Sequence, residues 1–318
     1  MFKFNNTLDF APRKNDLFIV GEILIDMISQ EYCENFENDT YSKNFGGSPG
    51  NIAMNVKMLG LEPLFVAAVG DDGFGNYLIR RLKENGNNTK YINKVNYSTS
   101  LVVITKSKSS PNAIFYRNAD YHIEYTEELK IELGKSKILH FSSWPISQKL
   151  SREAIEAMIE DAKKSNVLIC FDPNFHPKIW EENHDGIKYI KQLISEVDII
   201  KPSEDDAKRL FGEDKAENHI KKFLDLGAKF VIMTIGKDGA IVSNGEEIRY
   251  YESLADEVVD TTGAGDAFWS GFYAGLINGY TLEKALKIGF AVSALKLKST
   301  GAIIKLPNIE QIQKTYNI

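Results

Sequence analysis

The sequence predicts an α/β fold with a mainly parallel sheet, and two features of the chain carry this prediction. Short apolar runs, several rich in Val and Ile, alternate with stretches of helical periodicity over most of the 318 residues. This alternation is typical of βαβ units, whose parallel strands are buried on both faces. Residues 27–45 and 95–125 depart from it, because they hold strand-like runs with no helix between them. We therefore expect one domain, 1–318, with these segments pairing into a small inserted β-sheet that covers a cleft as a lid.

The strands of the main sheet are expected at short apolar runs. The first run, 17–21, reads LFIVG and is continuously apolar until its glycine. A strand buried on both faces requires such continuity. The later runs of the same kind are 63–69, 138–141, 167–171, 197–200 and 230–235.

Two helices of the body have clear start or stop signals. In 50–59 the apolar residues fall on one helical face, Ser48 is placed to cap the helix, and Pro49 lies near its first turn. A second helix repeats apolar residues at four-residue spacing from Phe74, and Gly86 is expected to end it.

Composition excludes several classes of protein. The chain is 43% hydrophobic and 26% charged, which excludes a disordered or low-complexity protein. With 38 Lys and Arg against 44 Asp and Glu, the net charge of -6 argues against a broad nucleic-acid surface. Cys33 and Cys170 lie far apart and match no disulfide or zinc spacing. No apolar run reaches the roughly 18 residues that span a bilayer, so we expect a soluble, cytoplasmic protein.

The segment 260–266, DTTGAGD, is the most informative motif. It opens an apolar helix in which Phe268 and Phe272 recur at four-residue spacing. Glycines at a helix start let the backbone approach an anion, and the unpaired N–H groups and the helix dipole favour a phosphate there. Asp266 lies beside these donors and is placed to accept a proton from a hydroxyl that attacks phosphorus. The alternative is an Asp favoured by the dipole in a glycine-rich turn.

A second glycine-rich turn, 45–51, precedes another helix and ends at Asn51, whose amide offers a donor and an acceptor to a polyol. Taken alone it is only a loop. Its glycines do not directly follow a strand with the G-x-G-x-x-G spacing, which excludes a dinucleotide fingerprint. A Walker A loop is excluded as well, because Leu129 stands where its first glycine belongs.

Polar residues follow two of the expected strands at the edge where ligands bind in open α/β sheets. Asp26 follows one apolar run, and Asp172 and Asn174 follow another. Together they suit a hydroxyl-rich substrate, although each alone fits a turn. Arg117, in the expected lid, either contacts substrate oxygens or is a solvated arginine. His140 is expected to be a core histidine.

These segments, in this order, resemble the ribokinase-like (PfkB) carbohydrate kinases. Residues 44–60 and 260–268 are similar to the two signatures of that family. The likeness extends to 21–26, 70–75, 172–174, 201–204 and 234–239, and so covers nearly the whole chain. It implies a three-layer α/β/α body with a mainly parallel sheet and a small inserted β-sheet lid. It also implies ATP as phosphoryl donor, Mg²⁺, often a monovalent cation such as K⁺, and a homodimer formed through the lid.

The resemblance assigns roles position by position. The catalytic base is Asp266, and the anion hole consists of the backbone N–H groups of Gly263, Ala264 and Gly265. The implied sugar-binding residues are Asp26, Gly46, Gly47 and Asn51, to which Arg117, Asp172 and Asn174 are added from the reasoning above. The implied nucleotide-binding residues are Thr234, Gly236, Gly239, Lys201 and Gly265. Asp260 and Thr262 match monovalent-cation ligands.

Two departures from the family pattern bear on the metal and the substrate. The Asn-x-x-Glu that organises Mg²⁺ reads Ser203 to Asp206 here, which leaves the shorter Asp206 to hold the metal-bound water. The Asp-Pro-Asn-x-Arg of the fructokinase branch ends in His176, which replaces a permanent cation by a titratable imidazole. This exchange favours a neutral ketohexose over a sugar acid.

The expected reaction is therefore the ATP-dependent phosphorylation of D-fructose to fructose 6-phosphate. The alternatives are a 2-keto-3-deoxygluconate kinase, a ribokinase or nucleoside kinase, and a non-catalytic sugar-binding protein. Ile114 and Phe115 are expected to offer the apolar lid face for a dimer.

Overall fold

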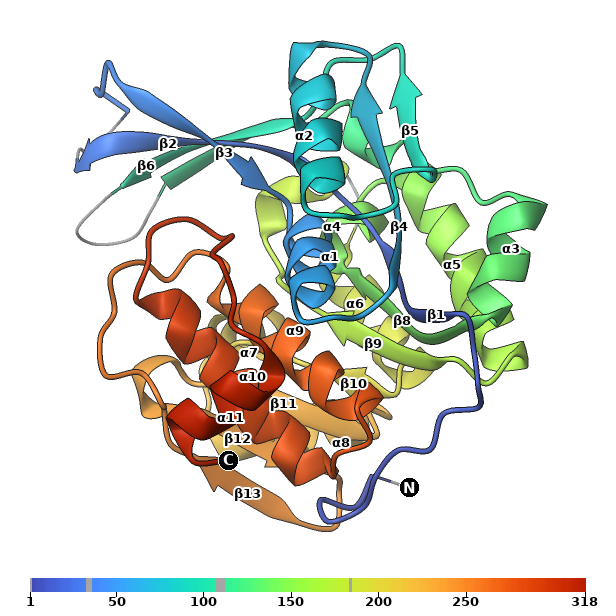
Figure 1. Ribbon diagram of the computed structural model, residues 1–318, viewed down its shortest axis with the longest axis vertical. Coiled ribbons are helices and arrows are strands. Elements are labelled where there is room, and N and C mark those ends of the chain that lie inside the picture. Colours follow the sequence, from blue (N-terminus) through green and yellow to red (C-terminus); the bar gives the residue numbers. More distant parts are fainter. Residues whose placement is uncertain (1, 33–35, 107–111, 183–184) are drawn as a thin grey trace.

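The structure is a computed structural model that describes residues 2–32, 36–106, 112–182 and 185–318. Its main sheet has the strand order β13-β12-β11-β10-β9-β8-β1-β4-β5 (Figure 1). All the neighbouring pairs are parallel except those that β12 makes with β11 and β13. The strands are β1 (Asn15–Val20), β4 (Pro63–Gly70), β5 (Ile92–Val95), β8 (Ser136–Ser142), β9 (Leu168–Asp172), β10 (Ile199–Ile200), β11 (Phe230–Thr234), β12 (Ala240–Ser243) and β13 (Ile248–Tyr251).

Helices cover both faces of this sheet, which makes the body three-layered. Along β1, Leu17 and Ile19 pack into one hydrophobic core, and Phe18 and Val20 pack into the other. Successive residues of a strand point to opposite faces, so a continuously apolar strand supplies both cores. The helices are α1 (Ser48–Met58), α2 (Gly73–Glu84), α3 (Glu127–Gly134), α4 (Ser143–Ile146), α5 (Lys149–Lys164), α6 (Gly186–Leu193), α7 (Glu204–Phe211), α8 (Ala216–Asp225), α9 (Ala264–Ile277), α10 (Leu282–Leu297) and α11 (Ile309–Tyr316).

The six runs predicted as strands of the main sheet are strands in the structure, and the predicted fold class is confirmed. The helix predicted from Phe74 ends as expected, with Gly86 at a φ of 84° directly after the C-cap Asn85. The hairpin of β12 and β13 was missed, because its four-residue strands are too short to show a period.

A second, smaller sheet has the strand order β3-β2-β6-β7 and extends away from the body (Figure 1). Its strands are β2 (Leu24–Tyr32), β3 (Tyr41–Gly46), β6 (Leu101–Lys106) and β7 (Asn112–Tyr116). The parallel pairing of β2 with β6 joins the two segments that depart from the βα alternation, so their expected pairing is confirmed. That this small sheet acts as a lid stays a prediction.

The expected dimer face needs a correction at one residue. Ile114 is exposed, but the Phe115 ring lies 4.9 Å from the His176 ring and 5.5 Å from the Trp144 ring, both in the body. Adjacent strand residues face opposite ways, so only one of the two can belong to an outer face. The dimer itself stays a prediction.

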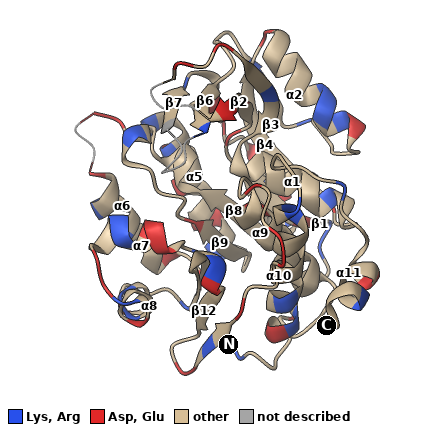
Figure 2. Ribbon diagram, turned by 90° about the vertical axis from the view of Figure 1, so that its left-hand side faces the viewer, with Lys and Arg blue, Asp and Glu red and all other residues tan. Residues whose placement is uncertain are grey.

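Charges of both signs share the surface helices. Figure 2 shows acidic and basic residues side by side on α7 and α8, and Lys208 on α7 lies 3.1 Å from the Glu204 carboxylate. Cys170 is buried with a free thiol, and Cys33 lies outside the described residues. Within the described chain, none of the helices is long and apolar enough to cross a membrane.

Candidate active site

Asp266 lies in the first turn of α9, where the two helices that follow the glycine-rich turns meet. Its side chain is buried, with 8% of the residue exposed. One carboxylate oxygen accepts a hydrogen bond from Ser48 Oγ at 2.6 Å and the other accepts one from Asn51 Nδ2 at 2.9 Å. Burial raises the pKa of Asp266 to about 6, although both hydrogen bonds oppose the shift. The carboxylate is thus held by two donors and is basic enough to take a proton near neutral pH.

Ser48 does not cap α1, contrary to the sequence prediction. Gly47 is the N-cap, with a φ of 96° and no side-chain cap bond, while the Ser48 hydroxyl turns to Asp266. A Cβ on Gly47 would lie 2.5 Å from the carbonyl oxygen of Glu22, so only glycine fits this turn.

Glu22 is a residue of the site that sequence reasoning did not assign. Its carboxylate is buried and accepts the backbone N–H of Ser48 at 3.1 Å and the Ser142 hydroxyl at 3.4 Å. Burial raises its pKa to about 8. Glu22 therefore positions the Ser48 turn, and through it Asp266. The only sequence signal is its place directly after β1 and Gly21.

Asp26 and Asn51 both lie near Asp266: Asn51 donates to its carboxylate, and its charge acts on Asp26. Asp26 is the third residue of β2, in the smaller sheet, and not at the end of a strand as the sequence predicted. Burial, with the charge of Asp266 as a second cause, raises the pKa of Asp26 to about 7. A Cβ on Gly46 would lie 2.2 Å from an oxygen of the Asp26 carboxylate, so this glycine makes room for it. Asn51 Oδ1 is buried and has no hydrogen-bond partner among the described residues. An orphaned buried acceptor beside two carboxyl groups suits the hydroxyls of a sugar.

Asp172 and Lys201 form a buried pair on the other side of Asp266. Lys201 Nζ lies 3.1 Å from Asp172 Oδ2, and this oxygen also accepts the Trp269 indole N–H at 2.8 Å. A Cβ on Gly265 would lie 3.3 Å from Lys201 Nζ, so the ammonium stands beside the glycine turn. Asp172 Oδ2 thus orients a cation, and the contact of Asp172 with a sugar stays a prediction. Asn174 is exposed at φ 34°, and its carbonyl accepts the Ser143 hydroxyl.

The glycine turn before α9 presents fewer free amides than predicted. Gly263 is the left-handed N-cap, at φ 75°, and a Cβ there would lie 2.8 Å from Ala302 Cα. The N–H of Ala264 donates to Thr261 O at 3.1 Å, so it is already used. The amides of Gly263 and Gly265 make no backbone bond of this kind among the described residues. The predicted anion hole is thus reduced to these two amides, and its role stays a prediction.

A cavity of about 360 Å³ opens on the far side of the glycine turn. Thr234, Gly236 and Gly239, predicted for the nucleotide, line it together with Gly265. Sequence reasoning missed its apolar wall, whose members are Leu254, Val258, Phe268, Phe290, Ala294 and Leu297. Several of these belong to α9 and α10, where helical periodicity makes them look like core. The result is an apolar slot beside an anion-binding turn.

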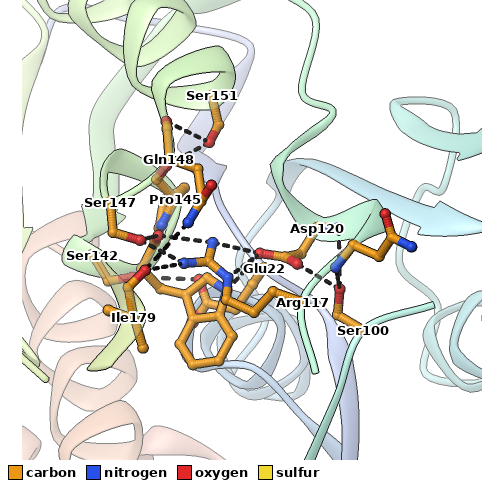
Figure 3. A network of polar contacts seen from close by, with 12 residues as sticks. Glu22, Ser100, Arg117, Asp120, Ser142, Pro145, Ser147, Gln148, Ser151 and Ile179 are labelled. Atoms are coloured by element: carbon orange, nitrogen blue, oxygen red, sulfur yellow. Dashed lines mark hydrogen bonds and ion pairs between the residues drawn. The ribbon is translucent and has the colours of Figure 1, made fainter. Parts of the chain in front are cut away.

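The N–H groups of the Arg117 guanidinium already donate to other parts of the protein, which leaves none for a substrate (Figure 3). Nε and Nη2 donate to Asp120 Oδ2 at 3.0 and 2.6 Å, and Nη2 also donates to Trp144 O at 3.1 Å. Nη1 donates to Ser147 Oγ and Ile179 O at 2.5 and 3.0 Å. All five N–H groups of a guanidinium are satisfied by these contacts. The prediction that Arg117 contacts substrate is replaced by a structural ion pair.

Both carboxylate oxygens of Asp206 already accept hydrogen bonds from the protein. Oδ1 accepts the N–H of Phe175 at 2.6 Å, and Oδ2 accepts the N–H and hydroxyl of Ser203 at 2.8 and 2.6 Å. The Ser203 hydroxyl in turn accepts the N–H of Asp206, which completes a capping box on α7. This geometry favours a cap over the predicted metal role. Within the described ranges, no group of three or more His, Cys, Asp or Glu could hold a metal ion.

His140 is a core histidine, as predicted. Nδ1 lies 2.6 Å from the Tyr273 hydroxyl, and burial lowers the pKa of the imidazole to about 3. It is therefore neutral at physiological pH and takes no part in the site.

Comparisons with known proteins agree with this geometry. The family model described as pfkB family carbohydrate kinase matches residues 14–309. The chain is 61% identical to an ATP-dependent 6-phosphofructokinase of Thermoanaerobacterium thermosaccharolyticum, over 100% of this chain and 99% of the relative. A solved fructokinase of Halothermothrix orenii is 36% identical, with a TM-score of 0.79 and coverage of 91% of this chain and 99% of that one.

A more distant structure shows the same fold. The fructokinase of Vibrio cholerae O395, in its fructose, ADP and calcium ion bound form, is 24% identical, with a TM-score of 0.80 and coverage of 94% of this chain and 98% of that one. A buried carboxylate in the first turn of a helix, a glycine turn and an apolar slot occur on a chain whose sequence matches the family model almost throughout. This protein therefore belongs to the pfkB family of carbohydrate kinases.

Proposed function

We propose that this kinase transfers the γ-phosphoryl group of ATP to the O1 hydroxyl of fructose 6-phosphate. The observation that carries the reaction is the position of Asp266. It lies between the orphaned Asn51 Oδ1 and Asp26 on one side and the glycine turn with its cavity on the other. A hydroxyl bound on the first side can attack a phosphoryl group bound on the second.

In the proposed reaction, the acceptor oxygen forms a bond to the γ-phosphorus while the bond from phosphorus to the ADP oxygen breaks. The acceptor proton goes to Asp266, whose pKa of about 6 leaves it mostly ionised at pH 7. The amides of Gly263 and Gly265 and the Lys201 ammonium, which stands beside Gly265, would stabilise the charge that the transferred group gains. ATP is expected in the 360 Å³ cavity, with its adenine against the apolar wall.

Mg²⁺ fits this site as an ion bound chiefly by the nucleotide. It usually keeps several waters and binds through one or two carboxylates plus substrate phosphates, so a site without a three-carboxylate cluster still suits it. The ion would neutralise charge on the transferring group. Asp206 is the carboxylate assigned to its bound water by resemblance, and that role stays a prediction.

Two candidate acceptors are weighed, fructose and fructose 6-phosphate. D-Fructose is the expectation from sequence, and the Halothermothrix orenii relative is a fructokinase. The relative with 61% identity is called a 6-phosphofructokinase. Because O6 of the 6-phosphate is already esterified, the primary hydroxyl left to react is O1.

A basic rim supports the phosphorylated acceptor. Val102 on β6 pairs with Asp26 on one side and with Phe115 on the other, so Phe115 shares the sheet face of Asp26. The Phe115 ring contacts His176, and the charges of Arg209 and Lys178 help burial to lower the pKa of this histidine. Arg209 and Lys178 thus place two positive charges near His176, and we take this rim as the part of the acceptor space where a phosphate would be neutralised.

The test is ADP release with Mg·ATP across fructose 6-phosphate, fructose, ribose, adenosine and 2-keto-3-deoxygluconate. We expect kcat/KM for fructose 6-phosphate to exceed that for fructose by about tenfold or more. Asp266→Asn should bind the acceptor and lose turnover by about 10²–10⁴-fold. A preference for free fructose would return the assignment to fructokinase. An Asp266→Asn variant with most of its turnover would remove Asp266 as the base.

A further inference from the structure

Lys296, near the end of α10, carries a buried charge for which the mechanism above has no use. The side chain is 0% exposed. Its Nζ donates to the carbonyl oxygens of Asp260 at 2.7 Å and Ser299 at 3.1 Å, and lies 3.8 Å from Asp260 Oδ2. A buried ammonium without partners is strongly unfavourable, so this group of oxygens is arranged to hold one cation.

The same oxygens belong to the two loops that support the glycine turn. Asp260 Oδ1 accepts the N–H of Thr262 at 2.9 Å, and Oδ2 accepts the N–H of Gly301 at 2.7 Å. The loop around Ser299 then continues to Ala302, against which Gly263 is packed. Lys296 therefore links two loops. One leads from Asp260 into the glycine turn, and the other, from Ser299 to Ala302, packs against that turn.

This arrangement does not fit the monovalent cation that the family resemblance implies for Asp260 and Thr262. A free cation would have to share the carbonyl and carboxylate oxygens of Asp260 with the ammonium. Two positive charges that share the same oxygens in a buried place repel each other strongly. The oxygen cluster is thus already neutralised by the chain itself.

We infer that Lys296 is a tethered cation, which orders the anion-hole loop and supplies the positive charge that a K⁺ ion would otherwise bring. The kinase should therefore work without K⁺. Lys296 is a positioning residue, because it acts through the loop from Asp260 to Gly263 and contacts no reacting atom. Its loss should lower kcat and nucleotide affinity more than it changes the KM for the acceptor, since the loop faces the phosphates.

The first experiment measures kcat of the wild-type protein in tetramethylammonium chloride, and then with Na⁺, K⁺ or NH₄⁺ added at constant ionic strength. We expect kcat to change by less than about twofold. Activation by K⁺ of about tenfold or more would overturn the inference. The inference rests on the proposed kinase reaction, so the affinity for a non-hydrolysable Mg·ATP analogue is measured by calorimetry in the same salts. This second readout needs no acceptor, and it decides the inference even if fructose 6-phosphate is the wrong one.

The second experiment removes the charge. Lys296→Ala should lose about tenfold or more in kcat and should regain much of it with methylammonium, NH₄⁺ or K⁺, which can enter the space left by the side chain. Lys287→Met, an exposed lysine of the same helix paired with Glu283, is the matched control and should match the wild type. A folded Lys296→Ala that keeps full turnover, or that no cation rescues, would contradict the inference. If this variant does not fold, the wild-type salt series still decides.

Discussion

Ser48 and Asp266 are 218 positions apart in the chain, and their side chains share a hydrogen bond of 2.6 Å in the interior of the site. The bond joins the first turn of α1 to the first turn of α9. The two glycine-rich turns that the sequence shows as separate motifs are therefore one structural unit. Because the backbone N–H of Ser48 is held by Glu22, the Asp266 carboxylate is oriented through α1 from the loop that follows β1.

Removing the Ser48 hydroxyl should move the acid limb of the pH profile. This hydrogen bond lowers the pKa of Asp266, so Ser48→Ala raises that pKa above about 6. The base is active when deprotonated, and the fall of kcat/KM on the acid side should begin at higher pH, by about one unit. Rates measured from pH 5 to 9 test this. An unchanged limb would show that Asp266 is not the group that titrates there.

The basic rim can be tested against the choice of acceptor. Arg209 on α7 donates to the carbonyl of Phe175 at 2.8 Å, which leaves further guanidinium N–H groups for a ligand. Arg209→Gln should raise the KM for fructose 6-phosphate about tenfold and change the KM for fructose by less than about twofold. The exposed Arg80→Gln on α2 serves as control. Equal effects on both acceptors would place the phosphate elsewhere.

The sequence predicted the parts of the site that follow local rules. A glycine turn that opens an apolar helix indicates an anion site, and Asp266 lies in the first turn of α9, directly after such a turn. Its role as the base stays a prediction. The same local rules failed for Ser48, whose hydroxyl leaves the cap position for a partner far along the chain. They failed for Arg117 as well, because besides the nearby Asp120 its acceptors lie on α4 with its C-cap and at Ile179, two segments that only the fold brings to it.

The apolar wall of the 360 Å³ cavity shows a second limit of prediction from sequence. Phe268 and Phe290 lie on helical stripes that pack partly in the core and partly along the cavity. Helical periodicity reports which face of a helix is covered, but not whether side chains or a ligand cover it. Lys296 is similar, because a lysine in an apolar helix is expected at the surface unless the oxygens that pair with it are known.

Arg117 should matter for stability rather than for substrate binding. The ion pair with Asp120 is buried, with 8% and 0% of the two side chains exposed. Arg117→Met leaves the Asp120 charge without its cation, which should cost about 3–5 kcal/mol in the free energy of unfolding. Urea denaturation measures this, and Arg81→Met, in an exposed pair with Glu84, should cost less than about 1 kcal/mol. A stable Arg117→Met with a raised KM for the acceptor would restore the substrate role.

The raised pKa of Glu22 predicts how the free energy of unfolding depends on pH. Its folded-state pKa of about 8 lies above the ordinary value of 4.5, so the folded protein binds this proton more tightly than the unfolded chain does. Its contribution to the free energy of unfolding is therefore present below pH 4.5 and is lost as pH rises through 8. Glu22→Gln keeps an acceptor for the Ser48 N–H and cannot ionise. Between pH 6 and 8, we expect the free energy of unfolding to fall less steeply in this variant than in the wild type, by about 1 kcal/mol per pH unit.

Urea titrations at several pH values measure these slopes, and Glu246→Gln, in the exposed turn between β12 and β13, should keep the wild-type slope. Asp26 and Asp266 also have raised pKa values, but they remain in both proteins, so the difference between the slopes belongs to Glu22. Equal slopes would mean that Glu22 is already ionised in the folded protein at neutral pH. The Ser48 turn would then rest on a buried carboxylate, and a further cation would have to compensate it.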